Sequence, residues 1–364
     1  MFLSRNFLPC HRIERMPAMS QLSFFDLDNR YKSLSKLGDP LEVLDRSIPW
    51  ESFRPALDKA LRKSRKSNAG RKPYDLVLMF KVLVLQSLYN LSDDQTEYQI
   101  KDRLSFTRFL GLHNEDAIPD AKTLWVFRDA LSQKGAVEKL FKRFNRFLDD
   151  EGLVARQGQI IDASIVPVPI QRNTRAENES VKQGQTPETW KDKPHKLRRK
   201  DTDARWTKKN GASYFGYKNH VNTDRKHKLI RNYETTHAAV HDSQVFKNLL
   251  DPDNTGKKVW ADSAYRSEQS DKELKRLNLK NEIHYKGYRN RPLSEARLRV
   301  NKKRSKVRAR VEHIFGYQQN SLGGKLVRTV GMARARAKIG MMNLVYNMRR
   351  YLFLQKLSLP QPAT

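Results

Sequence analysis

Three acidic residues stand in settings where a carboxylate is unexpected. Asp162 lies inside the β-branched run 160–165, and Asp262 ends the apolar run VWAD. Aspartate is depleted in strands because its side chain competes for backbone hydrogen bonds. Glu312 lies in VRARVEHIF, a stretch of helical period that is otherwise rich in arginine. Binding sites in α/β sheets gather at the carboxyl ends of strands, so we expect the three acids to meet at such an edge.

Three clustered carboxylates indicate a bound cation. Without one, the like charges repel and the pKa of one of the acids rises. Hard divalent ions such as Mg²⁺ prefer oxygen ligands and are often held by a few carboxylates plus substrate phosphates. Two such ions about 3.5–4 Å apart stabilise both the attacking and the leaving oxygen of an in-line phosphoryl displacement. The three acids therefore predict a centre that holds Mg²⁺ or Mn²⁺, as two ions, and that cuts or joins a phosphodiester backbone.

A purely structural interpretation is open for each acid as well. Asp162 fits an anchor for a loop, and Asp262 fits a cap for the helix that begins near Ser267. Glu312 is placed for an ordinary ion pair with Arg308, its neighbour four residues earlier on the helix. Isolated motifs have high false-positive rates, so sequence context alone leaves both interpretations open.

Histidine and cysteine offer weaker alternatives for a metal site. His237 and His241 are four residues apart and would face one metal from a helix, but HAAVH lacks the adjacent glutamate of the zinc-protease pattern. A structural role beside Asp242 is the preferred interpretation of this pair. The single cysteine, Cys10, excludes an internal disulfide framework and a cysteine-based zinc site, and it receives no role.

The charge balance points to a polyanionic partner. The 364 residues include 71 Lys and Arg against 40 Asp and Glu, a net charge of +31. Two tracts are nearly unmixed: residues 286–338 carry 16 basic residues against two acids, and residues 191–231 carry 14 against four. A solvated charged face usually mixes both signs. The clustering therefore favours contact with double-stranded DNA.

No segment has the sequence of a membrane anchor. The most apolar run, residues 76–91, is 16 residues long and contains Lys81 and Gln86. A spanning helix needs about 20 apolar residues, so this run is predicted to be a buried helix. The start, MFLSRNFLPC, lacks the continuous apolar stretch of a signal peptide. We expect no membrane association and a cytoplasmic protein that acts on chromosomal DNA.

The first half of the chain is predicted to be helical. Residues 1–39 show no sustained period and are expected to form a disordered leader. Residues 40–152 follow the i, i+3, i+4 rhythm of helices and are assigned to an all-helical amino-terminal domain. Ser92 followed by Gln95 predicts a capping box, and Asp120 predicts a helix cap.

The second half, residues 153–356, is predicted to be α/β. QIIDASIV predicts a strand, YFGYKNHVNTD and KLIRNYETTH a hairpin, and VWAD the end of a further strand. From residue 293 onward the pattern is helical, with breaks expected at Gly316 and at Gly323–Gly324. Residues 171–212 are polar and charged, and they are expected to form a long basic loop. The fold class is therefore a mixed sheet with covering helices, preceded by the all-helical domain.

These segments, taken in order, resemble a known family. IIDASIV, YFGYKNHVNTD, HDSQVFKNLL, VWADSAYRS and RARVEHIFG look like the transposases of the IS5 group of bacterial insertion sequences, within the IS4-like DDE superfamily. The front half, with GRKPYDLVLMFKVLVLQSLYNL and IPDAKTLWVFRDAL, resembles the amino-terminal domain of the same proteins. The resemblance covers residues 21–354, and its specificity comes from the ordered set rather than from any single motif.

The resemblance implies a ribonuclease-H-like catalytic core with a DDE triad that binds Mg²⁺. Asp162 matches the first aspartate of the triad, Asp262 the second and Glu312 the closing glutamate. Arg308 matches the arginine of the superfamily signature Y-(2)-R-(3)-E-(6)-K.

Two positions depart from that signature. Ser305 stands at the tyrosine position and Gln319 at the lysine position. In relatives this lysine is thought to touch the DNA end, so Lys325 is a possible substitute for it. Alternatively, recognition of the end differs here.

Four residues near the triad are assigned to DNA contact: Arg308, Lys218, Tyr265 and Lys325. Tyr265 lies close to the basic tracts, where its ring would stack on an unpaired base at a cleaved end. Packing against the sheet is the more common role of such aromatics. It is preferred for Phe215, and both roles stay open for Tyr265.

The combined interpretation is a DNA transposase. It would cleave the ends of an insertion sequence and join the freed 3′-OH to target DNA, with the helical domain recognising the terminal inverted repeats. The resemblance also implies a homodimer on DNA, because two ends must be handled together. Two alternatives stay open: a catalytically dead DNA-binding relic or repressor of the same element, and a nuclease that cuts without joining.

Overall fold

A computed structural model describes residues 26–61, 72–113, 115–153, 157–254 and 256–358. Most of the predicted leader, including Cys10, lies outside these residues. Its last part contains helix α1 (Asp26–Lys36), so the expectation of a leader without secondary structure is wrong there. The described residues divide into two units, one that ends at Pro40 and one that begins at Leu41, and the rest of the description concerns the second unit.

The front of the second unit is helical, as predicted. Its helices are α2 (Pro40–Ser47), the 3₁₀ helix η1 (Trp50–Phe53), α3 (Arg54–Leu61), α4 (Leu76–Leu88), α5 (Asp93–Asp102), α6 (Leu104–Leu110), α7 (Ala121–Gln133) and α8 (Ala136–Asp150). The predicted capping box is confirmed, since the Ser92 side chain accepts from the Gln95 amide and the Gln95 side chain accepts from the Ser92 amide. Asp120 caps α7 as predicted.

Helix α4 is the apolar run that the sequence identified as a buried helix. Its N-cap is Asp75, whose carboxylate accepts from the amides of Val77 and Leu78, so the helix begins at Leu76. Buried side chains face all sides of the helix, as a helix inside a core requires. Among the described residues, no single helix combines the length and apolar composition of a membrane span. Only the pair α4 and α5, bent by 103°, does so when counted together.

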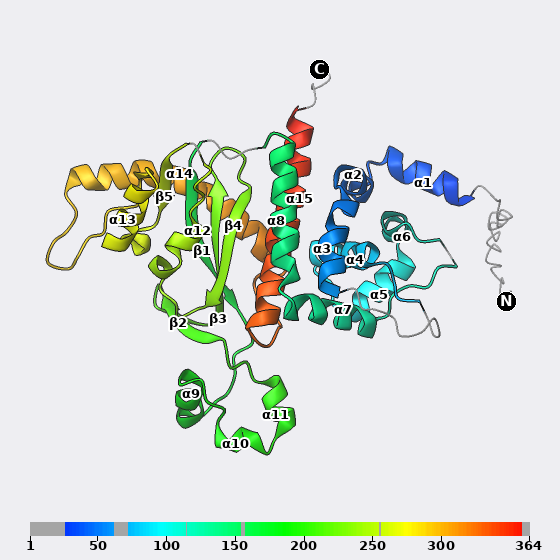
Figure 1. Ribbon diagram of the computed structural model, residues 1–364, viewed down its shortest axis with the longest axis horizontal. Helices are drawn as coiled ribbons and strands as arrows, with labels where there is room; N and C mark the ends of the chain where they lie inside the picture. Colours follow the sequence, from blue (N-terminus) through cyan, green and yellow to red (C-terminus); the bar gives the residue numbers. More distant parts are fainter. Residues whose placement is uncertain (1–25, 62–71, 114, 154–156, 255, 359–364) are drawn as a thin grey trace, which may run out of the picture. The chain divides into compact units, whose positions relative to one another are not determined.

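The second half is built on a six-stranded mixed sheet (Figure 1). Its strands are β1 (Gln159–Pro167), β2 (Arg205–Lys209), β3 (Ala212–Asp224), β4 (Ile230–His237), β5 (Lys258–Ala261) and β6 (Lys280–Asn281). The long strand β3 pairs antiparallel with β1, β2 and β4, while β5 is parallel to both β1 and β6. The predicted strand at residues 159–166, the predicted hairpin and the mixed α/β class are therefore confirmed.

Helices follow the central strands. They are η2 (Asp242–Gln244), α12 (Phe246–Leu249), η3 (Ser263–Tyr265), α13 (Glu268–Arg276), α14 (Glu295–Ser321) and α15 (Met332–Ser358). The predicted break at Gly316 is wrong, because α14 runs through it. The break at Gly323–Gly324 is confirmed, since Gly323 has a positive φ of 73° just after α14 ends.

The predicted basic loop 171–212 is largely ordered into short elements. Helices α9 (Arg175–Lys182), α10 (Glu188–Lys191) and α11 (Pro194–Arg199) form a separate small group beside the sheet, and β2 follows them (Figure 1). The centre of the group is Trp190, which is fully buried and donates from Nε1 to the Glu177 carboxylate. The expectation of a loop is wrong because this group builds its small core from one aromatic ring and a buried carboxylate instead of an apolar stripe.

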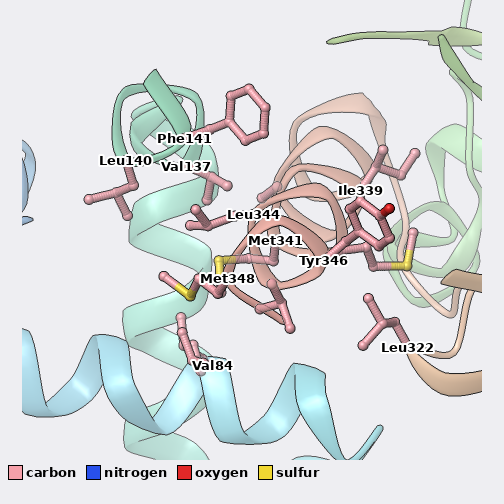
Figure 2. Close-up of a cluster of buried hydrophobic side chains, with 14 of the residues drawn as sticks. Val84, Val137, Leu140, Phe141, Leu322, Ile339, Met341, Leu344, Tyr346 and Met348 are labelled. Atoms are coloured by element: carbon pink, nitrogen blue, oxygen red, sulfur yellow. The ribbon is translucent and has the colours of Figure 1, made fainter. Parts of the chain in front are cut away.

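One hydrophobic core joins the front helices to the back of the sheet. In Figure 2 the side chains of α15, among them Met341 and Leu344, lie between Val84 of α4, Val137 of α8 and Leu322 after α14. The core continues to both sides of residue 152, so the packing shows no gap at the boundary that the sequence predicts between the two domains.

Candidate active site

The two aspartates are brought together by strand register. In the parallel pairing of β1 with β5, Ile161 lies opposite Ala261. Asp162 and Asp262 each follow this pair by one residue, so the two aspartates lie at the same level of the sheet. Asp262 comes directly after the carboxyl end of β5, where the chain turns into η3.

Helix α14 carries Glu312 to the same edge. The helix packs on β1 and β5, with Val311, Ile314 and Phe315 buried. Glu312 lies on the outward side, where about two thirds of its side chain is exposed.

Arg308, one turn before Glu312, sits between the three acids. Its Nε and Nη2 donate to Oδ2 of Asp162 at 3.2 and 3.0 Å. Its Nη1 lies 3.9 Å from Oδ1 of Asp262, and its Nη2 lies 3.9 Å from Oε1 of Glu312. The structure therefore gathers the three predicted acids, far apart in the chain, around one guanidinium group.

The three acids differ in how deeply their side chains are buried. The Asp162 side chain is 12% exposed, whereas that of Asp262 is 44% and that of Glu312 is 65% exposed. Burial raises the pKa of the Asp162 carboxyl above its usual value, and the Arg308 guanidinium opposes this shift. Burial lowers the pKa of Arg308, but the charges of Asp162 and Asp262 outweigh it and raise the pKa overall. Each group thus supports the charged form of the other.

The donor set suits a hard divalent ion, but the present arrangement is not a metal cage. Three carboxylates supply the oxygen ligands that Mg²⁺ and Mn²⁺ prefer. Within the described residues, however, no three His, Cys, Asp or Glu side chains are grouped closely enough to hold an ion. The cationic group between the acids is Arg308, which binds Oδ2 of Asp162, while Oδ1 accepts from the Ala163 amide. An ion that uses Oδ2 must therefore compete with the guanidinium.

The structural interpretations of the acids hold only in part. Asp162 lies within β1 rather than in a loop. Asp262 caps η3 by accepting from the Ser263 amide, whereas α13 is capped by Ser267 itself. The Glu312–Arg308 pair exists at 3.9 Å, but both partners belong to the larger group of acids.

Two of the predicted DNA contacts are engaged inside the protein. Tyr265 is fully buried against Phe246 in a second hydrophobic cluster, so its ring is not accessible to a base. The Lys218 ammonium donates to the Val240 carbonyl and to Asp242, both at 2.8 Å. The structure therefore disagrees with surface roles for these two residues. Their burial follows from long-range packing, which the basic tracts in the sequence do not reveal.

The signature positions lie along α14 and the loop after it. Gln319 donates to Oγ of Ser164 on β1 at 3.3 Å, and Ser305 lies 3.5 Å from Nε2 of His284. Lys325 is exposed in the loop after α14 and is free to meet a ligand.

The two histidines considered for a zinc site do not share a helix. His237 ends β4, and His241 caps η2.

One aromatic ring surrounded by arginines was not predicted. The Tyr285 ring lies 4.6 Å from the guanidinium carbon of Arg266, 4.8 Å from that of Arg304 and 5.2 Å from that of Arg297. The preceding residue, His284, donates its amide to the Ala261 carbonyl, next to Asp262. The only sequence signal was an aromatic residue within a basic tract.

Two models of known protein families match the chain. A model described as "Transposase DDE domain" matches residues 155–348, more than half of the chain. A second model, "Transposase domain (DUF772)", matches residues 28–130. The chain therefore belongs to the DDE transposase domain family. Among solved structures it is similar to the piggyBac transposase in a cryo-EM structure of its synaptic complex with hairpin DNA. The identity is 11%, 88% of this chain and 76% of that chain are covered, and the TM-score is 0.42.

Proposed function

We propose that this protein is an IS5-group transposase that cleaves insertion-sequence ends and joins the 3′-OH to target DNA. The observation that carries the proposal is the meeting of Asp162, Asp262 and Glu312 around one cationic group at the edge of the sheet. The order β4–β3–β1–β5–β6, antiparallel on one side of β1 and parallel on the other, supports a ribonuclease-H-like core.

In this proposal, Asp162, Asp262 and Glu312 are the residues that hold Mg²⁺ or Mn²⁺, as two ions. The bound ions would activate a water or hydroxyl nucleophile and neutralise charge on the scissile phosphate. Asp162, fixed in the central strand, sets the position of the site. The more exposed Asp262 and Glu312 face the side from which DNA arrives.

The chain's own cations hold the substrate. Exposed basic residues on α14, Lys302 and Lys306, lie one to three turns before Glu312 on the same helix. A guanidinium released from Asp162 is suited to bind a phosphate oxygen with two hydrogen bonds, so Arg308 is expected to exchange the carboxylate for DNA. We further propose that the front helices recognise the terminal inverted repeats and that two copies act together on two DNA ends.

A second candidate function is a DNA-binding relic or repressor without catalysis. The specific observation in its favour is that Arg308 already gives the buried Asp162 carboxylate a counter-ion from the protein itself, so Asp162 needs no metal ion for charge pairing. A nuclease that cuts without joining is the third possibility, and a strand-transfer assay separates it from the transposase.

The substitution Asp262→Asn distinguishes the enzyme from the binder. Asp262 is partly exposed, and its structural bond to the Ser263 amide is available to an asparagine oxygen. The variant is therefore expected to fold, to bind DNA as the natural protein does, and to lose Mg²⁺-dependent nicking by at least about a hundredfold. Glu268→Gln, which removes an exposed acid at the start of α13, is the matched control and is expected to keep full nicking.

If nicking survives in Asp262→Asn, the assignment of the carboxylates is wrong. If the natural protein binds DNA and never nicks it with Mg²⁺ or Mn²⁺, the binding protein is the correct interpretation.

A further inference from the structure

A cavity of about 690 Å³ lies between the front helices and α15. One wall comes from α4, α5 and α7, and the other from α15 and the loop 323–330 that precedes it. Helix α11 contributes Arg198 at the rim. None of the three acids of the candidate active site lines this cavity.

The lining carries more positive than negative charge. Five cationic side chains line it, Arg128, Arg198, Arg328, Arg334 and Lys338, against two acids, Asp93 and Asp129. Both acids are already engaged. Arg128 forms an ion pair with Asp93, and Arg334 pairs with Asp129 at 2.7 Å.

Three cations in the cavity are left without a protein counter-ion among the described residues. Arg198 and Arg328 are exposed at the rim, and Lys338 is half-buried on the α15 wall. Burial lowers the pKa of Lys338 to about 8, and the nearby charge of Arg128 lowers it further, while Asp93 opposes the shift. A half-buried ammonium beside a guanidinium is costly unless an anion completes it.

The cavity is connected to the candidate active site by one strand and one loop. Asp162 and Pro167 belong to β1, and the Pro167 carbonyl accepts from the amide of Val327, which lines the cavity. A strand rises about 3.3 Å per residue, so five residues span roughly 17 Å. Base pairs stack about 3.4 Å apart, so this span corresponds to roughly five base pairs of a duplex.

Lys325 lies in the chain between the candidate active site and the cavity. It is exposed in the loop between α14 and the cavity, after Gln319, which contacts Ser164 of β1. Lys325 and the rim cations Arg328 and Arg198 are therefore exposed cations available to backbone phosphates between the acids and the cavity.

We infer that this cavity is a second DNA-contact site. It binds backbone phosphates of double-stranded DNA roughly five base pairs from the phosphodiester bond that is attacked at the three acids. The inference rests on the proposed function, because it takes the acids as the place where the backbone is attacked. Trp125 lies on the rim beside Arg334, with 47% of its surface exposed, and so reports on anything that enters.

Salt dependence of DNA affinity tests the site. The full chain is titrated into a labelled duplex of about 30 base pairs in EDTA between 50 and 200 mM KCl. The test variant combines Arg198→Gln, Arg328→Gln and Lys338→Met. The control combines Lys272→Gln, Lys275→Gln and Lys280→Gln, which remove the same charge from exposed positions on α13 and β6.

Each lost phosphate contact lowers the slope of log affinity against log salt by about 0.9. We expect the cavity variant to lower the slope by about two to three and the control to lower it by less than about one. Equal slopes for the two variants would overturn the inference. Loss of inorganic phosphate binding in the cavity variant with an unchanged duplex slope would also overturn it, because the cavity would then serve a small anion.

Tryptophan fluorescence gives a second readout that does not depend on the triple variant folding. Trp125 and Trp206 are the exposed tryptophans of the described chain, at 47% and 44%. We expect duplex DNA to quench the fluorescence and Trp125→Phe to remove most of the quenching. Quenching that is unchanged in Trp125→Phe counts against the cavity.

The two proposals fail separately. If the cavity variant lowers the salt slope but the natural protein shows no metal-dependent nicking, the cavity is a DNA-contact site and the proposed enzyme is wrong. Nicking by both variants with equal salt slopes keeps the enzyme and removes this site.

Discussion

Arg308 donates two hydrogen bonds to a single carboxylate oxygen of Asp162, the most buried acid of the candidate active site. The same guanidinium lies 3.9 Å from each of the other two acids. Three carboxylates that repel one another are thus held together by a cation that belongs to the protein. The arrangement explains how the site is stable before a substrate or metal arrives, and it makes Arg308 a competitor of any ion that binds there.

The substitution Arg308→Gln is expected to raise the affinity of the DNA-free protein for Mn²⁺ by about tenfold or more. It removes the competing charge and leaves the buried Asp162 carboxylate without its counter-ion. Removing one partner of a buried ion pair typically costs about 3–5 kcal/mol of folding stability. The loss is expected to be smaller here, because the other two acids that Arg308 approaches are partly exposed to water. The variant should therefore unfold at lower urea concentration without metal, and added Mn²⁺ should restore more of the loss than in the natural protein. Isothermal titration and urea denaturation measure the two effects.

Arg304→Gln is the control for that experiment. Arg304 lies one turn earlier on α14 and pairs with Glu282 at 2.9 Å, away from the three acids. It should lose stability without gaining Mn²⁺ affinity. An Arg308→Gln protein that binds Mn²⁺ no better than the natural chain would show that the guanidinium does not occupy the ion's place.

The acids were predictable from sequence because their contexts are local. An aspartate inside a β-branched run is visible in the chain itself, and the parallel register then places Asp162 level with Asp262. The position of Arg308 against Asp162 was not predictable from local context, since the two residues are 146 positions apart. Local spacing linked Arg308 only to Glu312, its neighbour four residues along the helix.

The errors have physical causes of the same kind. The sequence left Tyr265 open between stacking on a DNA base and packing in the core, and the structure packs its ring on Phe246. Residues 171–212 were assigned to a loop because they lack an apolar period. There, the Glu177 carboxylate holds the short helices together in place of an apolar core, because it accepts hydrogen bonds from Trp190, Thr189 and Lys196.

The buried glutamate of this helical group gives a second prediction. Lys196 above all, together with the Thr174 amide, lowers the pKa of Glu177 to about 2. A lowered pKa means that this stabilisation is present above the unfolded value near 4.5 and is lost as the pH falls through that value toward 2. Glu177→Ala should open α9–α11 at neutral pH, seen as rapid limited proteolysis between residues 183 and 200. Glu179→Ala, an exposed neighbour paired with Lys182, should resist the protease like the natural chain. Equal cleavage of both variants would contradict the role of Glu177.

A pair of helical glycines gives a third prediction with opposite signs. A Cβ at Gly340 in α15 would lie 2.5 Å from the Tyr233 hydroxyl and 2.9 Å from Cγ1 of Val137. At Gly316 in α14, a Cβ would meet nothing within 4 Å. Alanine is favoured over glycine in a helix by about 1 kcal/mol, but overpacking a core costs about 1–3 kcal/mol. Gly316→Ala should therefore raise the free energy of unfolding, and Gly340→Ala should lower it, both measured by urea denaturation. A stabilised Gly340→Ala protein would show that α15 packs less closely on β4 and α8 than the structure has it.

The fourth prediction concerns the pH dependence of DNA affinity. Lys338 has its pKa lowered to about 8, first by burial and then by Arg128. A bound phosphate favours the charged ammonium, so DNA affinity should be constant below pH 8 and should fall by up to tenfold per pH unit above it. The charged groups that face the ammonium are Arg128 of α7 and Asp93 of α5, and Lys338 is the group among them whose pKa lies near this pH range. Lys338→Arg keeps the charge at all these pH values and should remove the decline.

Protein stability should change in the opposite direction over the same range. An unfolded lysine binds its proton up to about pH 10.5, so between pH 8 and 10.5 the unfolded chain binds more protons than the folded one. The free energy of unfolding therefore gains a contribution that rises with pH while DNA affinity falls. Fluorescence anisotropy at pH 7, 8 and 9 together with urea denaturation separates the two trends. A decline in DNA affinity that persists unchanged in Lys338→Arg would assign the titration to another group and remove Lys338 from the DNA path.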